Sequence, residues 1–86
     1  MLFVVYSEWK AEDVPKVVEV RRKNPVPKEI KILGEAVLFG QHKNVSIFEA
    51  PDEKTLFTWF VPFLQLITFK VIPALIPEGA MNLASG

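Results

Sequence analysis

Two hydrophobic patterns alternate along the chain, and their order constrains the fold more than any other feature. Four short segments have the apolar, β-branched and aromatic composition of β-strands, and two other segments have the signals of helices. The strands are predicted at residues 2–9, 29–39, 44–50 and 67–74, and the helices at residues 11–24 and from residue 51 onward. This β-α-β-β-α-β order predicts a ferredoxin-like α+β fold, in which two helices cover one face of a four-stranded antiparallel sheet.

Both predicted helices begin at recognisable start signals. The first opens with two acidic residues, has Pro15 in its first turn and closes on the basic run 21–23, which suits the negative end of a helix dipole. Asp52 is the predicted cap of the second helix, and Pro62 should end or kink that helix early. The apolar stripe of the second helix recurs at helical spacing and consists of Leu56, Trp59, Phe60 and Phe63.

The second and third strands are predicted to form a hairpin around the turn 40–43, and Gly34 is a candidate position for a β-bulge. Strict alternation along the second strand would give two opposed sets of side chains. One set is Ile30, Ile32, Gly34, Ala36 and Leu38, and the other is Lys31, Leu33, Glu35, Val37 and Phe39.

The chain is short for the apolar content that it carries. Its 86 residues, half of them hydrophobic, predict one domain over residues 1–75 and a tail over residues 76–86 that is mobile or lies on a partner. A domain of this size is marginally stable unless a disulfide, a metal or another chain helps. The absence of Cys and the single His exclude disulfides, Cys-based zinc sites, thiol nucleophiles and a His-rich metal site within one chain. We therefore predict no metal and no cofactor, and association is the remaining aid.

The charge balance and the distribution of polar residues argue against nucleic acid and membrane as partners. Ten basic and ten acidic residues give zero net charge, whereas a nucleic-acid-binding domain normally has a basic face. The basic run 21–23 is interpreted as a solvated helix end, with anion contact as the alternative. A membrane span over residues 56–76 is not predicted, because prolines, polar residues and Lys70 interrupt it. The N-terminus lacks the basic region of a signal peptide, which together with the absence of Cys predicts a cytoplasmic protein.

Apolar side chains occur on both faces of the predicted strands, although two helices can cover only one face of a sheet. The opposed sets are Leu2, Val4 and Tyr6 against Phe3, Val5 and Trp9; Leu33, Val37 and Phe39 against Ile30, Ile32 and Leu38; Phe48 against Val45 and Ile47; and Ile72 against Phe69 and Val71. An uncovered apolar face promotes aggregation, so we predict a homodimer that packs its two sheets face to face. Phe48→Asp is predicted to disrupt this assembly.

Several stretches of the chain carry a resemblance to a known family. They are Met1-Leu2-Phe3-Val4-Val5, Leu33-Gly34-Glu35, Glu49-Ala50-Pro51-Asp52, the positions Leu56, Trp59, Phe63 and Leu66, and Phe69-Lys70-Val71-Ile72-Pro73. Over residues 1–75 the chain resembles a small family of prokaryotic domains of unknown function in the dimeric α/β-barrel superfamily. Phe63 and Gln65 stand where that family is expected to have a second Trp and an Asp, so no polar role is implied for that helix end. The resemblance implies a ferredoxin-like fold and a dimer. It leaves activity open, because the superfamily mixes cofactor-free oxygenases, isomerases, haem-handling enzymes and ligand sensors.

His42, Tyr6 and Glu35 are the candidate residues for proton transfer. His42 has the side chain whose ordinary pKa lies closest to neutrality, which makes it the default general base, with an exposed turn residue as the alternative. Tyr6, Glu35, Ser46 and Lys70 are polar groups on otherwise apolar strands, and alternation can place some of them inside a barrel cavity. The alternatives are a core Tyr6 with a bonded hydroxyl, and Glu35 and Lys70 as a cross-strand pair or as solvent-exposed groups.

A second group of residues is a candidate ligand pocket, with ordinary core packing as the alternative for its aromatic members. This group is Trp9, Ser46, Phe48, Trp59, Phe63 and Lys70. The sequence lacks the Gly and paired aromatics of an RNA-recognition sheet, a Gly-rich phosphate loop and a Cys-x-x-Cys motif. Two classes of function remain: a module that binds a small hydrophobic ligand or a partner without catalysis, and, as the alternative, a cofactor-free oxygenase or isomerase that acts on a hydrophobic substrate.

Overall fold

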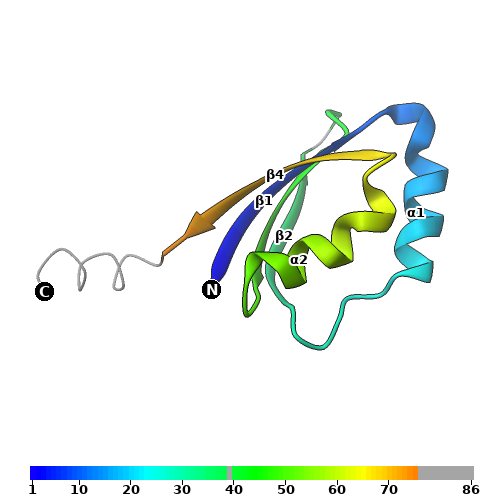
Figure 1. The fold of residues 1–86 in the computed structure, drawn as a ribbon. Helices are drawn as coiled ribbons and strands as arrows, with labels where there is room; N and C mark the ends of the chain where they lie inside the picture. Colours follow the sequence, from blue (N-terminus) through cyan, green and yellow to red (C-terminus); the bar gives the residue numbers. More distant parts are fainter. Residues whose placement is uncertain (39, 76–86) are drawn as a thin grey trace, which may run out of the picture.

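The computed structural model describes residues 1–38 and 40–75, and Figure 1 shows their arrangement. The elements in chain order are β1 (Leu2–Trp9), the 3₁₀ turn η1 (Ala11–Asp13), α1 (Val14–Lys23), β2 (Lys31–Leu38), β3 (Lys43–Glu49), α2 (Glu53–Phe60), the 3₁₀ turn η2 (Val61–Phe63) and β4 (Ile67–Ala74). This order confirms the predicted β-α-β-β-α-β arrangement. Residue 39, expected at the end of the second strand, and the expected tail 76–86 lie outside the described residues.

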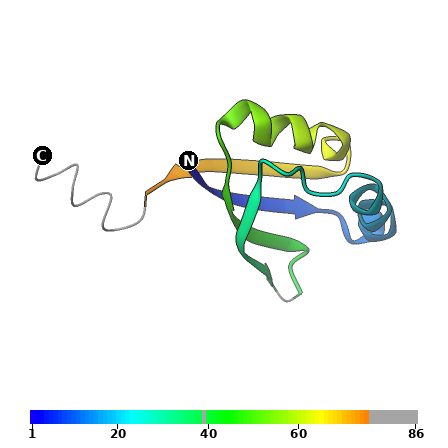
Figure 2. The same ribbon diagram turned by 90° about the horizontal axis from the view of Figure 1, so that it is seen from below.

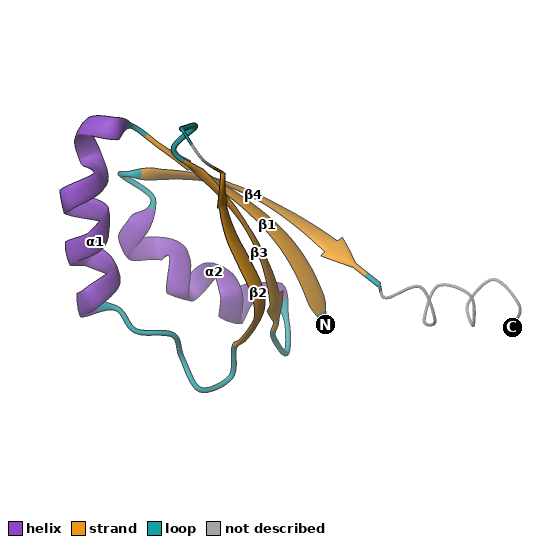
Figure 3. Cartoon of the chain, turned by 180° about the vertical axis from the view of Figure 1, so that it is seen from behind, coloured by secondary structure: helices purple, strands orange, loops and turns teal. Residues whose placement is uncertain are grey.

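The four strands form one antiparallel sheet in the order β2-β3-β1-β4, which is the predicted ferredoxin-like fold. β1 and β3 occupy the centre of the sheet, and β2 and β4 are its edges. Figure 3 shows that α1 and α2 lie on the same side of this sheet. In Figure 2 α1 is viewed nearly along its axis whereas α2 is viewed from the side, so the two helices cross at a large angle. They therefore do not cover the sheet as a parallel pair.

The ends of α2 follow from two local signals. The Asp52 carboxylate caps the helix, because its Oδ1 accepts hydrogen bonds from the hydroxyl and the backbone N–H of Thr55, each at 2.7 Å. These two bonds hold the pKa of Asp52 below its ordinary value, and the bond from the Thr55 hydroxyl has the larger effect. At the other end α2 stops at Phe60, and the chain continues as the 3₁₀ turn that contains Pro62. Both the cap and the early end confirm the sequence predictions.

A β-bulge in β2 changes which side chains share a face. The register shifts between Ile32, which pairs with Phe48, and Gly34, which pairs with Ile47. Leu33 is the extra residue, and the strand resumes its alternation after it. Ile32 therefore shares the helix-covered face with Glu35 and Val37, while Gly34, Ala36 and Leu38 lie on the opposite face. The bulge at Gly34 confirms the sequence prediction, but the expectation that Ile32 and Leu38 share a face was wrong, because strict alternation takes no account of the bulge.

The hydrophobic core lies between the sheet and α2. Its buried members are Phe3, Val5, Ile30, Phe48, Ala50, Leu56, Trp59, Phe60, Phe63 and Ile67. Phe48 is only 5% exposed and makes an edge-to-face contact with Trp59, with ring centroids 5.5 Å apart. The prediction that Phe48→Asp disrupts the dimer requires Phe48 on the uncovered face of the sheet, and that placement is wrong. Alternation along β3 places Phe48 beneath α2 and leaves Ile47, 42% exposed, on the other face.

The sheet face opposite the helices, called the open face below, has an apolar centre between two charged rows. Cross-strand pairing places Val4, Tyr6, Val45, Ile47 and Ile72 in its central rows, together with Lys70 on the edge strand β4. Tyr6, Ile47 and Ile72 are 46%, 42% and 39% exposed. The flanking rows pair Lys31 with Glu49 at one end and Glu8 with Lys43 at the other. Each charged row thus carries both signs.

Candidate functional site

A cavity of about 340 Å³ lies between α1, the segment formed by α2 and η2, and the sheet. We call it the pocket. The helical side contributes Val17, Val18 and Arg21 from α1, and Trp59, Phe60 and Phe63 from α2 and η2. The sheet contributes the polar residues Ser7, Glu35, Asn44 and Ser46 beside apolar residues that include Trp9, Phe48 and Phe69. Three walls are therefore largely apolar, and one edge is polar.

The pocket exists because α1 does not fill the space above the sheet. None of the residues of α1 is buried, and Val18 is 51% exposed although it lines the pocket. Beneath this helix the sheet carries Ser7 and Ser46, which are only 8% and 3% exposed. Each serine lies two residues along its strand from a core residue, Ser7 from Val5 and Ser46 from Phe48, so both point to the core side of the sheet. Small polar side chains at core positions leave a hollow that larger apolar side chains would close.

Aromatic rings form the apolar wall. Trp59 contacts Phe48 and Phe63 edge to face, with ring centroids 5.5 and 6.2 Å apart. Phe60 stacks on Phe69 at 4.1 Å with their planes 3° from parallel, which joins α2 to β4. The Trp59 ring is further oriented by its Nε1, which donates a hydrogen bond to the Asn24 carbonyl oxygen at 3.1 Å. Each ring of the wall therefore has at least one neighbour that sets its orientation.

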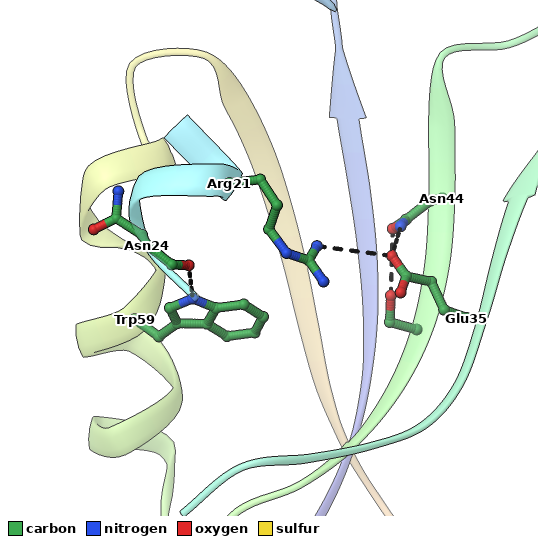
Figure 4. A network of polar contacts seen from close by, with 6 residues as sticks. Arg21, Asn24, Glu35, Asn44 and Trp59 are labelled. Atoms are coloured by element: carbon green, nitrogen blue, oxygen red, sulfur yellow. Dashed lines mark hydrogen bonds and ion pairs between the residues drawn. The ribbon is translucent and has the colours of Figure 1, made fainter. Parts of the chain in front are cut away.

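The polar edge is a connected network that spans the pocket (Figure 4). Asn44 Nδ2 donates to Glu35 Oε1 at 2.9 Å, and the Ser46 hydroxyl donates to Asn44 Oδ1 at 3.4 Å. Arg21 reaches from α1 toward this carboxylate, with 3.9 Å between its Nη1 and Glu35 Oε1. The same guanidinium lies 5.5 Å from the centroid of the Trp59 ring. The Arg21 and Glu35 side chains are 45% and 34% exposed, so they stand where the pocket meets solvent.

A family model described as a domain of unknown function (DUF3303) matches residues 1–86 of the chain. The chain belongs to the DUF3303 family. No curated protein matches it. The match agrees with the resemblance to a family of domains of unknown function that the sequence motifs indicated.

The DUF3303 structure brings most of the candidate ligand-pocket residues to one cavity. Trp9, Ser46, Phe48, Trp59 and Phe63 all line the pocket. Lys70 does not, because it lies on the open face opposite Tyr6, its pairing partner in β1. Of the two alternatives for Lys70 and Glu35, the cross-strand pair is wrong, since the two residues lie on different faces of the sheet. Both are instead exposed on the edge strands, which is the other alternative.

The three candidates for proton transfer in this DUF3303 domain are separated. Glu35 lines the pocket, whereas Tyr6 lies on the open face and is 46% exposed. His42 is an exposed residue of the β2–β3 turn, where it adopts a left-handed backbone with φ of 51°. Its carbonyl oxygen accepts a hydrogen bond from the Trp9 backbone N–H at 3.1 Å, and its side chain is not among the pocket residues. Of the three, only Glu35 is placed to act on a molecule in the pocket.

Sequence reasoning did not select Arg21, Asn44 or Ser7, which complete the polar edge of the pocket. Ser7 has a usable signal, because it shares the alternation of Phe3 and Val5 and is thus a polar residue on the core face. Asn44 stands two residues before Ser46 and shares its face in the same way. Arg21 shares the helical spacing of Val17 and Val18, which places it on the same face of α1, but its contact with Glu35 depends on the distance between α1 and β2.

The described residues lack two further kinds of feature. Within residues 1–38 and 40–75, no three His, Cys, Asp or Glu side chains are grouped so as to hold a metal ion. In the same ranges, no helix has the length and apolar content needed to cross a membrane.

Proposed function

We propose that this DUF3303 domain binds a small hydrophobic molecule in the pocket and forms a homodimer through the open face, as a member of the dimeric α/β-barrel superfamily. The observation that carries the binding proposal is the polar edge beneath α1. The domain places Ser7 and Ser46 at core positions and buries no residue of α1. It thereby loses apolar burial that a domain of this small size needs for stability. A binding site explains this loss.

The shape and chemistry of the pocket support a small ligand. Binding sites for small molecules usually measure about 300–1,000 Å³ and combine apolar walls with a few convergent polar groups. The cavity of about 340 Å³ lies at the lower end of that range, which fits a ligand of one or two rings. Its aromatic wall and single polar edge match this description.

The open face supports the homodimer. Stable interfaces have an apolar centre with a polar rim, and a twofold interface must be complementary to itself. The row of Val4, Ile47 and Ile72 is apolar, and the neighbouring row of Tyr6 and Val45 carries one charge, Lys70, on the edge strand β4. Each flanking row carries one Lys and one Glu. A twofold copy can therefore set opposite charges against each other at both ends of the sheet.

One observation favours an enzyme as the second candidate. Glu35 is the only carboxylate among the described residues that line the pocket, and Asn44 holds its Oε1 at 2.9 Å. A carboxylate fixed at the edge of an apolar cavity can accept a proton from a bound substrate. A cofactor-free isomerase or oxygenase predicts that Glu35→Gln stops turnover of the bound compound without abolishing its binding, whereas a binding module returns the compound unchanged.

The binding proposal is tested with N-phenyl-1-naphthylamine, an uncharged probe whose fluorescence rises in apolar surroundings. Val18→Asp places a charge on the pocket rim, and Val14→Asp makes the same change one turn earlier on α1, outside the pocket. Both side chains are at least 36% exposed, so both variants should fold. Losing about half of a valine contact, about 1 kcal/mol, should weaken probe binding about fivefold in Val18→Asp and leave Val14→Asp unchanged. Equal affinity in the two variants would place the probe elsewhere and contradict the proposal.

A further inference from the structure

The two charges at the mouth of the pocket face each other across a gap. The Arg21 Nη1 and Glu35 Oε1 atoms are 3.9 Å apart, which is beyond hydrogen-bond range. They belong to different elements, α1 and β2, on opposite sides of the opening. Among the described residues that line the pocket, Arg21 is the one basic side chain and Glu35 the one acidic side chain, so their formal charges cancel. Any ion that entered would bring an uncompensated charge into an apolar cavity, which is costly.

The same pair presents complementary hydrogen-bonding groups. A guanidinium can only donate hydrogen bonds, and an ionised carboxylate can only accept them. Asn44 fixes Glu35 Oε1 at 2.9 Å, and the Trp59 ring lies 5.5 Å from the Arg21 guanidinium, so both partners have a defined position. A group that lies against both atoms from the pocket side must offer an acceptor to Arg21 and a donor to Glu35. An amide of a ring does this with adjacent C=O and N–H groups.

We propose that the polar edge selects a neutral, planar ring compound that carries a hydrogen-bond donor and acceptor side by side, of the lactam class, over charged compounds of the same size. This inference rests on the proposed binding function of the pocket. The flat rings of Trp59, Phe48 and Phe60 line the cavity into which the apolar part of such a ring would extend. The carbonyl accepts from Arg21 and the N–H donates to Glu35, so the ligand bridges the two side chains from the pocket side.

The test compares four bicyclic compounds of nearly equal size by calorimetric titration at pH 7. They are 2-quinolinone as the lactam, naphthalene as the hydrocarbon, 2-naphthoate as the anion and 2-naphthylmethylammonium as the cation. Two added hydrogen bonds should make 2-quinolinone bind about tenfold more tightly than naphthalene. Both ions should bind more weakly than 2-quinolinone. The charges of Arg21 and Glu35 cancel each other, so the charge of a bound ion would stay uncompensated in the pocket.

Two variants test the assignment of the edge to Arg21 and Glu35. Glu35→Gln leaves Arg21 uncompensated and should raise the affinity for 2-naphthoate severalfold, while Arg21→Met should do the same for the ammonium compound. Naphthalene affinity should stay within twofold in Glu35→Gln, because the hydrocarbon does not contact the edge. Both side chains are more than one-third exposed at the mouth, so the variants should fold.

The outcomes separate this inference from the proposed function. Naphthalene that binds as well as 2-quinolinone, or an ion that binds most tightly to the unchanged protein, would overturn the lactam selectivity and leave a hydrophobic pocket standing. Failure of all four compounds to bind would overturn the binding function itself and the selectivity with it.

Discussion

Ile47 and Phe48 are neighbours in β3, and replacing each with Asp should have different consequences because they lie on opposite faces of the sheet. Phe48 is 5% exposed in the core, whereas Ile47 is 42% exposed on the open face. Phe48→Asp should unfold the protomer. Ile47→Asp should leave the protomer folded and dissociate the dimer.

The magnitudes follow from the areas involved. A buried aromatic side chain removes about 150–250 Å² from water, which at about 25 cal/mol per Å² is worth about 4–6 kcal/mol, before the cost of burying a carboxylate. A domain of 86 residues has a total stability of about 4–13 kcal/mol, so this loss and the cost of the buried carboxylate together consume most of it. Full burial of an isoleucine is worth about 1.5–3 kcal/mol, and Ile47 is already partly exposed, so its loss costs the protomer about 1 kcal/mol.

Ile47→Asp should reduce the free energy of dimer association more than the stability of the protomer. A twofold interface contains the substitution twice, so it loses the remaining apolar burial of two isoleucines and must also bury two carboxylates, together about 3 kcal/mol or more, which weakens association at least about a hundredfold. Sedimentation velocity measures the assembly state, and circular dichroism measures the fold. Leu64→Asp is the matched control, because Leu64 is 58% exposed on the connection between η2 and β4. A dimeric, folded Ile47→Asp protein, or an unchanged protein that sediments as a monomer, would refute the dimer; a folded Phe48→Asp protein would refute the placement of the core.

Three further predictions concern single residues. The Asp52 carboxylate has a lowered pKa in the folded protein, so its contribution to stability is present above the ordinary Asp pKa and is lost as the pH falls through the folded-state pKa. The Tm of Asp52→Ala should therefore lie furthest below that of the unchanged protein near neutral pH. A Tm difference of the same size in strong acid would contradict this linkage. Trp59→Phe keeps a ring but leaves the Asn24 carbonyl without its donor at 3.1 Å, which should cost about 1 kcal/mol and lower Tm by about 4–8 °C, whereas an unchanged Tm would show that the bond contributes nothing. Gly40 has a φ of 73° with open space around its Cβ position, so Gly40→Ala should destabilise the protein by about 1 kcal/mol through backbone strain alone, and a stabilised variant would rule out that conformation in solution.

Simple alternation grouped the side chains of three strands correctly and failed on the fourth, but it did not decide which group the helices cover, and Phe48 was assigned to the wrong face. In β1, β3 and β4 each strand is uninterrupted in its pairing, so odd and even residues kept to opposite faces. In β2 the bulge at Leu33 inserts one residue, and every side chain before it changes its face relative to those after it. The sequence indicated where a bulge was possible, at Gly34, but pairing with β3 decides whether it forms. Glu35 therefore joined Ile32 on the helix-covered face.

The pocket shows a similar division between what local pattern decides and what packing decides. Trp59 and Phe63 follow helical spacing, and Phe48 and Ser46 follow strand alternation, so their convergence could be anticipated from the chain. The space between them could not, because it depends on how far α1 stands from the sheet. The contact of Arg21 with Glu35 depends on that same distance, and no periodicity encodes it.

The location of a bound hydrophobic molecule tests the central claim most directly, because the pocket and the open face are both apolar. Naphthalene is titrated into the ¹⁵N-labelled protein, and the shifted backbone amide and indole signals are assigned. We predict that the largest shifts occur at the Trp59 indole N–H and at the amides of Ser46 and Phe48, which line the pocket. Shifts confined to Val4 and Ile72 on the open face, with Trp59 unchanged, would contradict the account.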